Sequence, residues 1–151
     1  MKDLSLITKS ADETRELGAK IGKHSEAGMV ILLDGDLGAG KTCLTQGIAK
    51  GLDISRSVTS PTFTIQKIYH GRLLLNHIDA YRLEDSDEDL GFDDIFYEDN
   101  VCVIEWGEFI EEFLPLEKLV FNIQLNGEER NIEIIATEKY RKIEERIGEN
   151  W

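Results

Sequence analysis

Glycines, a lysine and a threonine lie together in one octet, GDLGAGKT, from Gly35 to Thr42. The octet matches the pattern G-x-x-x-x-G-K-[ST], whose glycines let consecutive backbone N–H groups face one point and hold a polyphosphate. In this pattern Lys41 reaches the outer phosphates, and the Thr42 hydroxyl is a ligand of Mg²⁺. The octet therefore predicts a clamp for a nucleoside triphosphate rather than a merely flexible loop.

The segments on both sides of the octet fit this interpretation. The apolar run 29–34 is typical of a buried parallel strand, and an amphipathic helix is expected to follow to about Gly51. We expect the phosphates to be contacted mainly through backbone groups of the octet and of the residue after it. The predicted nucleotide-binding residues here are Gly35, Leu37, Gly38, Ala39, Gly40, Lys41, Thr42 and Cys43.

Two acidic residues, Asp79 and Glu105, each end an apolar run, LLLNHID and VCVIE respectively. An unpaired charge at such a position is costly, and Mg²⁺ in nucleotide sites needs a carboxylate from a neighbouring strand end. One of the two would complete the metal shell, and the other would orient or deprotonate the attacking water. The sequence does not decide which of the two residues binds the metal and which acts on the water. Together with Lys41 they are the predicted catalytic residues.

Three further positions have two possible interpretations each. The hydroxyl-rich stretch SPTFT, 60–64, is either a switch loop that senses the terminal phosphate or a turn with Pro61 at its corner. Trp106 could stack on a partner or on the switch loop, but a half-buried aromatic is commoner and is favoured here. His77 shares a strand face with Asp79, and a packed strand histidine is a commoner outcome than a metal ligand.

Composition sets the class of protein. The chain has 151 residues with 41% hydrophobic and 31% charged residues, which predicts one domain over residues 1–151. No apolar run is long enough to span a bilayer and no secretory signal is visible, so a cytoplasmic protein is expected. Its net charge of −13 repels phosphate backbones, so any polynucleotide would be held by a more basic partner. The two cysteines follow no zinc pattern and are expected to be reduced thiols.

Strand and helix patterns alternate along the chain, which predicts an α/β fold with a mixed central sheet flanked by helices. Ser10 and Glu13 form a capping box that opens a helix running to about Ala27. Strands are expected at 5–8, as an edge strand, and at 29–34 and 101–105. Two hairpins are expected, one formed by 62–69 and 72–79 and the other by 118–125 and 130–137. Helices are expected at 109–114 and, highly charged, at 138–151.

Five stretches occur in a recognisable order: GDLGAGKT, SPTFT, HIDAYRL, LGFDDIFYED and VIEWGE. With them the chain resembles the TsaE family, small bacterial P-loop ATPases of tRNA threonylcarbamoyladenosine synthesis, over residues 8–137. The resemblance implies a single-domain P-loop NTPase that binds ATP and Mg²⁺ and docks on an assembly of the TsaB and TsaD proteins. ATP hydrolysis would reset that assembly between turnovers, and tRNA would be reached only through it, away from any membrane.

The resemblance also implies roles for individual residues. Thr42 and Glu105 would hold Mg²⁺, and Asp79 would support the metal or the water. Ser60, Pro61 and Thr62 would form the switch loop, and Trp106 would lie near the site. Arg130 would lie near the nucleotide base, with Thr8 and Ser10 on its other side. The chain departs from the family pattern at Ala80, Gly107 and Cys43, none of which removes a charge or a metal ligand.

Two other functions are compatible with a phosphate clamp. A small-molecule P-loop kinase needs an acceptor pocket and usually arginines in a mobile lid, but arginine is sparse here and no arginine cluster follows the clamp helix. A nucleotide-gated binding module without catalysis would not need acidic residues at two strand ends.

Overall fold

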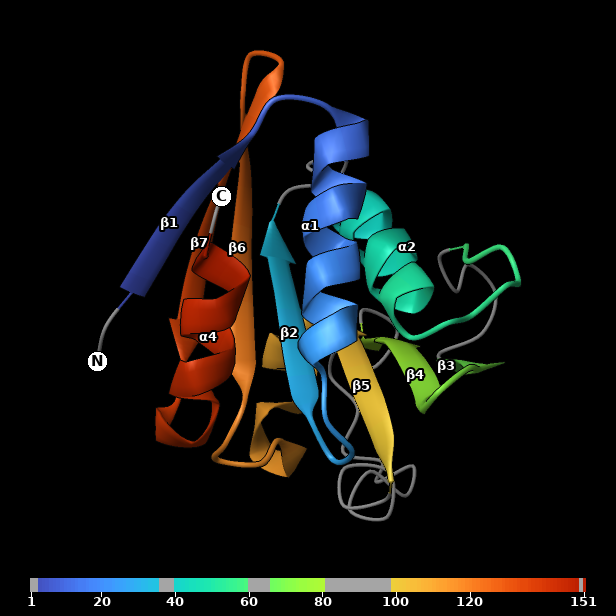
Figure 1. The fold of residues 1–151 in the computed structure, drawn as a ribbon. Helices are drawn as coiled ribbons and strands as arrows, with labels where there is room; N and C mark the ends of the chain where they lie inside the picture. The colour runs from blue at the N-terminus through green and yellow to red at the C-terminus, as the bar shows by residue number, and fades with distance from the viewer. Residues whose placement is uncertain (1–2, 36–39, 60–65, 81–98, 150) are drawn as a thin grey trace.

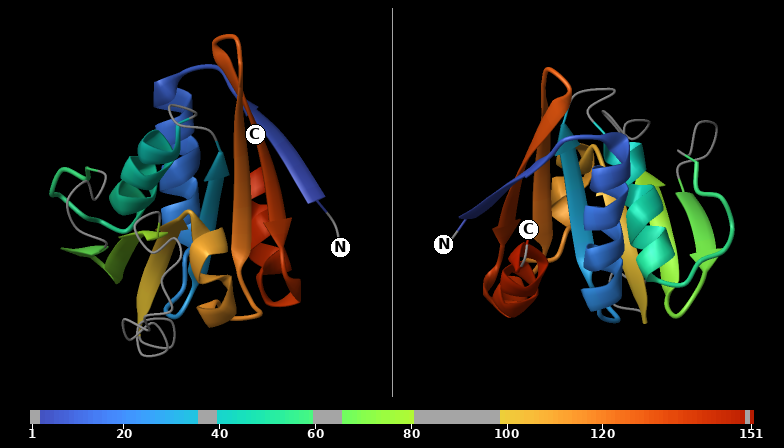
Figure 2. Two further views of the ribbon diagram at one scale, coloured as in Figure 1. Left: turned by 180° about the vertical axis from the view of Figure 1, so that it is seen from behind. Right: turned by 45° about the horizontal axis from the view of Figure 1, so that its top comes forward.

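The computed structural model describes residues 3–35, 40–59, 66–80, 99–149 and 151 of the chain. A seven-stranded sheet crosses the molecule, and the helices α1, α2 and α4 cover one of its faces (Figure 1). From behind, the 3-10 segment η2 lies against the opposite face (Figure 2). In chain order the elements are β1 (Asp3–Thr8), α1 (Ala11–His24), β2 (Val30–Gly35), α2 (Lys41–Gly51), β3 (Gln66–His70), β4 (Leu74–Asp79), β5 (Asn100–Glu105), η2 (Gly107–Phe113), β6 (Leu119–Asn126), β7 (Glu129–Ala136), η3 (Glu138–Tyr140) and α4 (Arg141–Gly148).

The sheet is mixed, with the strand order β1-β7-β6-β2-β5-β4-β3. The four central strands β6, β2, β5 and β4 are parallel to one another. Antiparallel pairs lie outside them, because β3 forms a hairpin with β4, β7 forms one with β6, and β1 adds to β7 at the edge. This arrangement confirms the mixed α/β sheet that the sequence predicts, including both hairpins and the edge position of the first strand.

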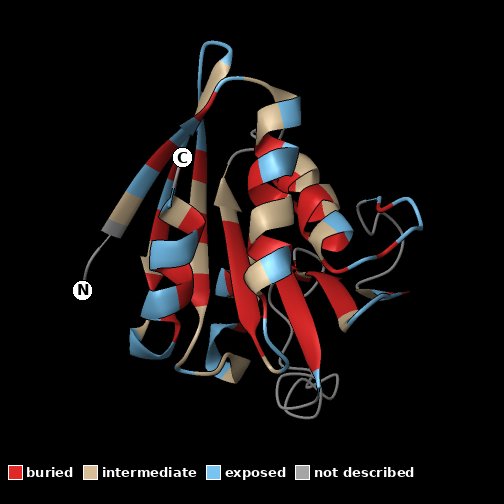
Figure 3. Ribbon diagram, viewed as in Figure 1, coloured by how far each residue is buried: buried red, intermediate tan, exposed pale blue. Residues whose placement is uncertain are grey.

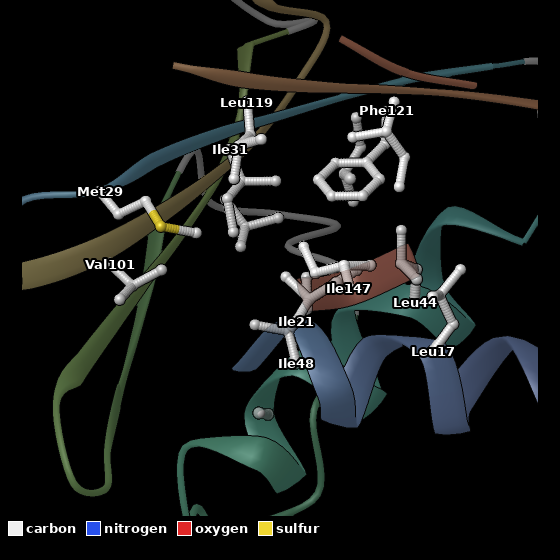
Figure 4. Packing of buried hydrophobic residues seen from close by; sticks show 14 of the residues in the cluster. Leu17, Ile21, Met29, Ile31, Leu44, Ile48, Val101, Leu119, Phe121 and Ile147 are labelled. Atoms are coloured by element: carbon white, nitrogen blue, oxygen red, sulfur yellow. The ribbon is translucent and has the colours of Figure 1, made fainter. Parts of the chain in front are cut away.

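The continuous apolar sequence of β2 follows from its central position. Ile31 and Leu33 face the helices and Val30 faces the other side, and all three are fully buried. Most of β2 is coloured as buried in Figure 3. A strand that is covered on both faces has no position for a polar side chain except near its ends. On the helical side the core packs Leu17 and Ile21 of α1 with side chains of α2, α4 and the central strands (Figure 4).

Helix α1 begins as the sequence predicts and ends earlier. The Ser10 side chain accepts a hydrogen bond from the Glu13 backbone N–H at 3.1 Å, and Glu13 in turn accepts one from the Lys9 N–H at 3.1 Å. The helix ends at His24 rather than near Ala27, because Ser25 adopts an extended backbone and its hydroxyl donates to the Ile21 carbonyl at 2.7 Å.

Helices α1 and α2 pack backbone against backbone. A Cβ atom placed on Gly18 would collide with the Leu44 carbonyl oxygen, and one placed on Gly47 would collide with the Arg15 carbonyl oxygen. Only glycine allows such a close approach of two helices. Because α2 begins within the octet, at Lys41, this contact fixes the position of the helix start that carries the octet's lysine and threonine.

Two expectations about helices need correction. Residues 109–114 do not form an α-helix: the segment is the 3-10 element η2, with a kink at Ile110 where φ is −130° and ψ is 25°. The C-terminal α-helix is limited to Arg141–Gly148 and follows the short 3-10 segment η3. Within the residues that the structure describes, no helix has the length and apolar character needed to cross a membrane.

Candidate nucleotide site

The parallel strands β2, β5 and β4 end side by side, so their carboxyl ends form one edge of the sheet. Glu105 at the end of β5 is the register partner of Leu33 in β2 on one side and of Asp79 in β4 on the other. Side chains alternate along a strand, and Val103 of β5 is packed under the helices. Glu105 therefore faces the helical side of the sheet as well, toward the start of α2. The two predicted acidic residues thus share one edge of the sheet with the octet.

The structure describes the first residue of the octet, Gly35, and its last three, Gly40 to Thr42. Gly35 ends β2, and Gly40 is the N-cap of α2 with the left-handed φ of 111°, which favours glycine. No side chain caps this helix start within the described residues. The N–H groups in the first turn of a helix, together with the positive end of the helix dipole, are suited to bind an anion.

The Lys41 side chain is held in a buried position beside Glu105 and Trp106. Its Nζ lies 3.8 Å from Glu105 Oε1 and 5.0 Å from the centre of the Trp106 ring. Lys41 and Glu105 are only 7% and 6% exposed, respectively. Buried charges of this kind occur paired, and the pair joins the predicted phosphate-binding lysine to one of the predicted metal ligands.

His77 lies under this pair. Its ring is fully buried, and Nε2 lies 2.8 Å from Glu105 Oε2. The burial confirms the packed strand histidine that the sequence favours, but the hydrogen bond to Glu105 was not predicted. The alternating pattern of the strand contained a signal for it, because His77 is on the same face as Asp79, whose register partner is Glu105.

Trp106 follows Glu105 directly and has an unusual backbone. Its φ is 60° and its ψ is 41°, the left-handed region that bulky residues rarely adopt. The half-buried indole stacks on the Phe109 ring, with the centroids 5.9 Å apart and the planes at 13°. This confirms the half-buried aromatic that the residue alone suggested, and the structure also places it beside Lys41.

A hollow of about 220 Å³ lies next to Lys41 and Trp106, and Asp34 and Glu108 line it as well. Burial raises the pKa of Asp34 above its ordinary value, and the nearby Glu108 raises it further, whereas Lys41 acts in the opposite direction. Neither Asp34 nor Glu108 was predicted from the sequence to line this hollow. The sequence did contain a signal for Asp34, because this residue directly precedes Gly35, the first residue of the octet.

On the other side of the octet, Arg130 lies close to Gly40. Its Nε is 3.5 Å from the point where a Cβ on Gly40 would lie, and it is buried without a hydrogen-bond partner among the described residues. Arg130 is the register partner of Thr8, and Ser10 caps α1 shortly after. Thr8 is buried, and its hydroxyl bonds that of Thr14 at 2.8 Å. The three residues predicted to surround the base thus lie on adjoining elements.

Comparisons with known proteins identify the family of this chain. Residues 8–134 match the family model described as threonylcarbamoyl adenosine biosynthesis protein TsaE. The chain belongs to the TsaE family. A TsaE protein of Bacillus subtilis is 47% identical over 90% of this chain and 87% of its own length. One of Streptomyces coelicolor is 40% identical over 91% of this chain and 93% of its own length. The crystal structure of Bacillus subtilis YdiB has a TM-score of 0.84 and 38% identity, and the alignment covers 97% of this chain and 94% of that one.

The donor set in this TsaE-family chain fits Mg²⁺ bound together with a nucleotide. Mg²⁺ takes oxygen ligands and is usually held by one or two carboxylates plus substrate phosphates and waters. Thr42, in the first turn of α2, together with Glu105 and Asp79 offers one hydroxyl and two carboxylates. In the described part of the chain no three His, Cys, Asp or Glu side chains gather as a metal cluster, so the phosphates would have to complete the shell.

The structure describes most, but not all, of the residues that the sequence singles out in this TsaE-family chain. It brings Lys41, Glu105 and Trp106 into contact and places Asp79 on the strand beside them. Cys43 is a partly exposed free thiol in the first turn of α2. The remaining positions lie outside the described residues: Leu37, Gly38, Ala39, Ser60, Pro61 and Thr62.

Proposed function

We propose that this chain is a Mg²⁺-dependent ATPase of tRNA threonylcarbamoyladenosine synthesis. The observation that carries the proposal is the buried contact between Lys41 and Glu105, 3.8 Å apart, at the sheet edge where α2 begins. A lysine at a helix start and an acidic strand end next to it are the two parts that phosphoryl transfer needs for charge stabilisation and metal binding. The names of the related TsaE proteins support the pathway.

Each residue has a defined task in this proposal. The N–H groups at the start of α2 bind the phosphates, and Lys41 neutralises charge on their outer oxygens. Thr42 and Glu105 would hold Mg²⁺, which supplies further stabilisation of negative charge on the phosphate oxygens when bound. Asp79 supports the metal shell or orients the attacking water. Arg130, Thr8 and Ser10 would surround the base.

We also propose that the protein works in the cytoplasm, docked on an assembly of TsaB and TsaD. A chain of net charge −13 is poorly suited to grip tRNA itself, whereas it can associate with a more basic assembly. Ser60, Pro61 and Thr62 would act as the switch loop that reports the nucleotide state to this assembly. Hydrolysis would then end the association and reset the partners.

Phosphate release from ATP tests the proposal. We expect slow Mg²⁺-dependent release by the purified chain without any acceptor, and faster release when TsaB and TsaD are added. The matched control is the variant Lys41→Ala, which should lose the activity under both conditions. No release in the presence of the partners would contradict the ATPase assignment, and release only with a small-molecule acceptor would identify a kinase instead.

A further inference from the structure

The contact between His77 and Glu105 has no part in the function proposed above. We infer that His77 is a positioning residue that fixes the Glu105 carboxylate in the orientation needed for Mg²⁺ binding. Its ring is fully buried, and its Nε2 lies 2.8 Å from Glu105 Oε2. The consequence for Mg²⁺ rests on the proposed function, whereas the contact itself can be tested without any nucleotide.

The chemistry of the two groups determines which of them donates. A carboxylate only accepts hydrogen bonds, so the proton of this contact is on His77 Nε2. His77 Nδ1 is buried and has no hydrogen-bond partner among the described residues, so within that part of the chain Glu105 is the only hydrogen-bond partner of the ring. A buried N–H needs a partner, and Glu105 provides it. The tautomer of His77 and the orientation of the Glu105 carboxylate therefore depend on each other.

The contact uses one oxygen of Glu105 and leaves the other directed to the phosphate-binding side. Oε2 accepts from His77, while Oε1 lies 3.8 Å from Lys41 Nζ, a distance too long for a hydrogen bond. Glutamate has several rotatable bonds, and a single long ion pair would not fix them. His77 and Lys41 hold the carboxylate from two sides, so Oε1 is presented where the octet ends.

A purely structural role would not need a histidine here. His77 lies on a strand face where Leu75 belongs to the apolar core, and an apolar side chain would fill that space without needing a partner. The hydrogen bond instead resembles the outer partners that orient metal ligands, whose loss typically weakens metal binding by about 10- to 100-fold.

Nuclear magnetic resonance of the nucleotide-free protein tests the contact. In ¹⁵N-labelled protein, the ring signals of His77 are assigned by their disappearance in His77→Gln, among the three histidines of the chain. We expect a proton on Nε2. A His77 ring that carries no proton on Nε2 would overturn the inference, whatever the protein does with ATP.

Calorimetric titration with a non-hydrolysable ATP analogue tests the consequence, with Mg²⁺ in one series and EDTA in the other. His77→Asn has a shorter amide that reaches only the Nδ1 position, whereas His77→Gln places an N–H near the Nε2 position. We expect the gain in affinity due to Mg²⁺ to fall about tenfold in His77→Asn and by less than about threefold in His77→Gln. Affinity in EDTA should change less than about twofold in both, and thermal melting checks that both are folded.

The outcomes separate the inference from the proposed function. An unchanged Mg²⁺ gain in His77→Asn, or an equal loss in both variants, would overturn the positioning role. If the unmodified protein binds the analogue equally well with Mg²⁺ and with EDTA, the assignment of Glu105 as a metal ligand is wrong, and with it the proposed function. The resonance experiment still decides the contact in that case.

Discussion

Replacing Glu105 by glutamine should have opposite effects on nucleotide binding with and without Mg²⁺. The amide has the shape of the carboxylate and can still accept a hydrogen bond from His77 through its oxygen, so the fold should be kept. The change removes one negative charge 3.8 Å from Lys41 Nζ. In the absence of Mg²⁺ this charge competes with the phosphates for Lys41 and also repels them.

The size of the effect follows from the distance. Two unit charges 3.8 Å apart attract each other by about 4 kcal/mol at an effective dielectric constant of about 20. Much of this is offset by desolvation, so a net change of about 1.4 kcal/mol, which is about tenfold in affinity, is a reasonable expectation. Glu105→Gln should therefore bind an ATP analogue about tenfold more tightly than the unmodified protein in EDTA. With Mg²⁺ the order should reverse, and hydrolysis should fall by at least about tenfold because the proposed metal ligand is lost.

Titration calorimetry in EDTA and in Mg²⁺, together with phosphate release, measures both effects. Glu112→Gln is the matched control, because it removes the same charge from an exposed position of η2 and should change neither affinity by more than about twofold. Weaker binding of Glu105→Gln in EDTA would refute the electrostatic reasoning. An unchanged Mg²⁺ gain would refute the role of Glu105 as a ligand.

Three further predictions follow from the described geometry. Lys41→Ala should weaken binding of an ATP analogue by about 10- to 100-fold in calorimetry, with or without Mg²⁺, because charge-assisted hydrogen bonds to the phosphates are lost. The same affinity in the variant and the unmodified protein would contradict the phosphate-binding role of Lys41. Gly47→Ala should lower the free energy of unfolding by about 1–3 kcal/mol and the melting temperature by about 2–12 °C, because its Cβ meets the Arg15 carbonyl. Gly127→Asn, in open space at a φ of 69°, is the control, and equal melting of both would show that the helices can move apart. Asp34→Asn should be more stable than the unmodified protein at pH 7, because burial raises the pKa of Asp34 and disfavours its ionised form in the folded chain. Chemical denaturation should show that this stability advantage shrinks as the pH falls through the folded pKa and vanishes below the ordinary value of 3.8. A stability advantage that does not depend on pH would point to another cause.

The fold could be predicted largely from local patterns. The apolar run of β2, the alternation in both hairpins and the Ser10 cap are consequences of burial and hydrogen bonding that act over a few residues. The end of α1 was harder to predict, because the extended backbone and hydroxyl of Ser25 end the helix before the expected position near Ala27. Residues 109–114 were misjudged because their spacing suits either kind of helix, and the kink at Ile110 is set by the packing of η2 on the sheet.

The candidate site could be predicted in its residues but not in its pairings. Lys41 stands out through the octet pattern, and Asp79 and Glu105 stand out because each ends an apolar run, where an unpartnered charge would be costly. Their contacts depend on strand order, which places β5 between β2 and β4 and so brings His77 below Glu105. A single sequence does not fix that order, so the hydrogen bond between His77 and Glu105 becomes visible only in three dimensions.

The backbone of Trp106 has a consequence for how this position can vary. At a φ of 60° a residue with a large side chain costs the fold about 1–3 kcal/mol, whereas glycine would adopt the bend almost without strain. Trp106→Gly would therefore relieve the main chain and still abolish the aromatic surface that faces the lysine ammonium group. The chain tolerates a strained bend in order to keep an indole at that place.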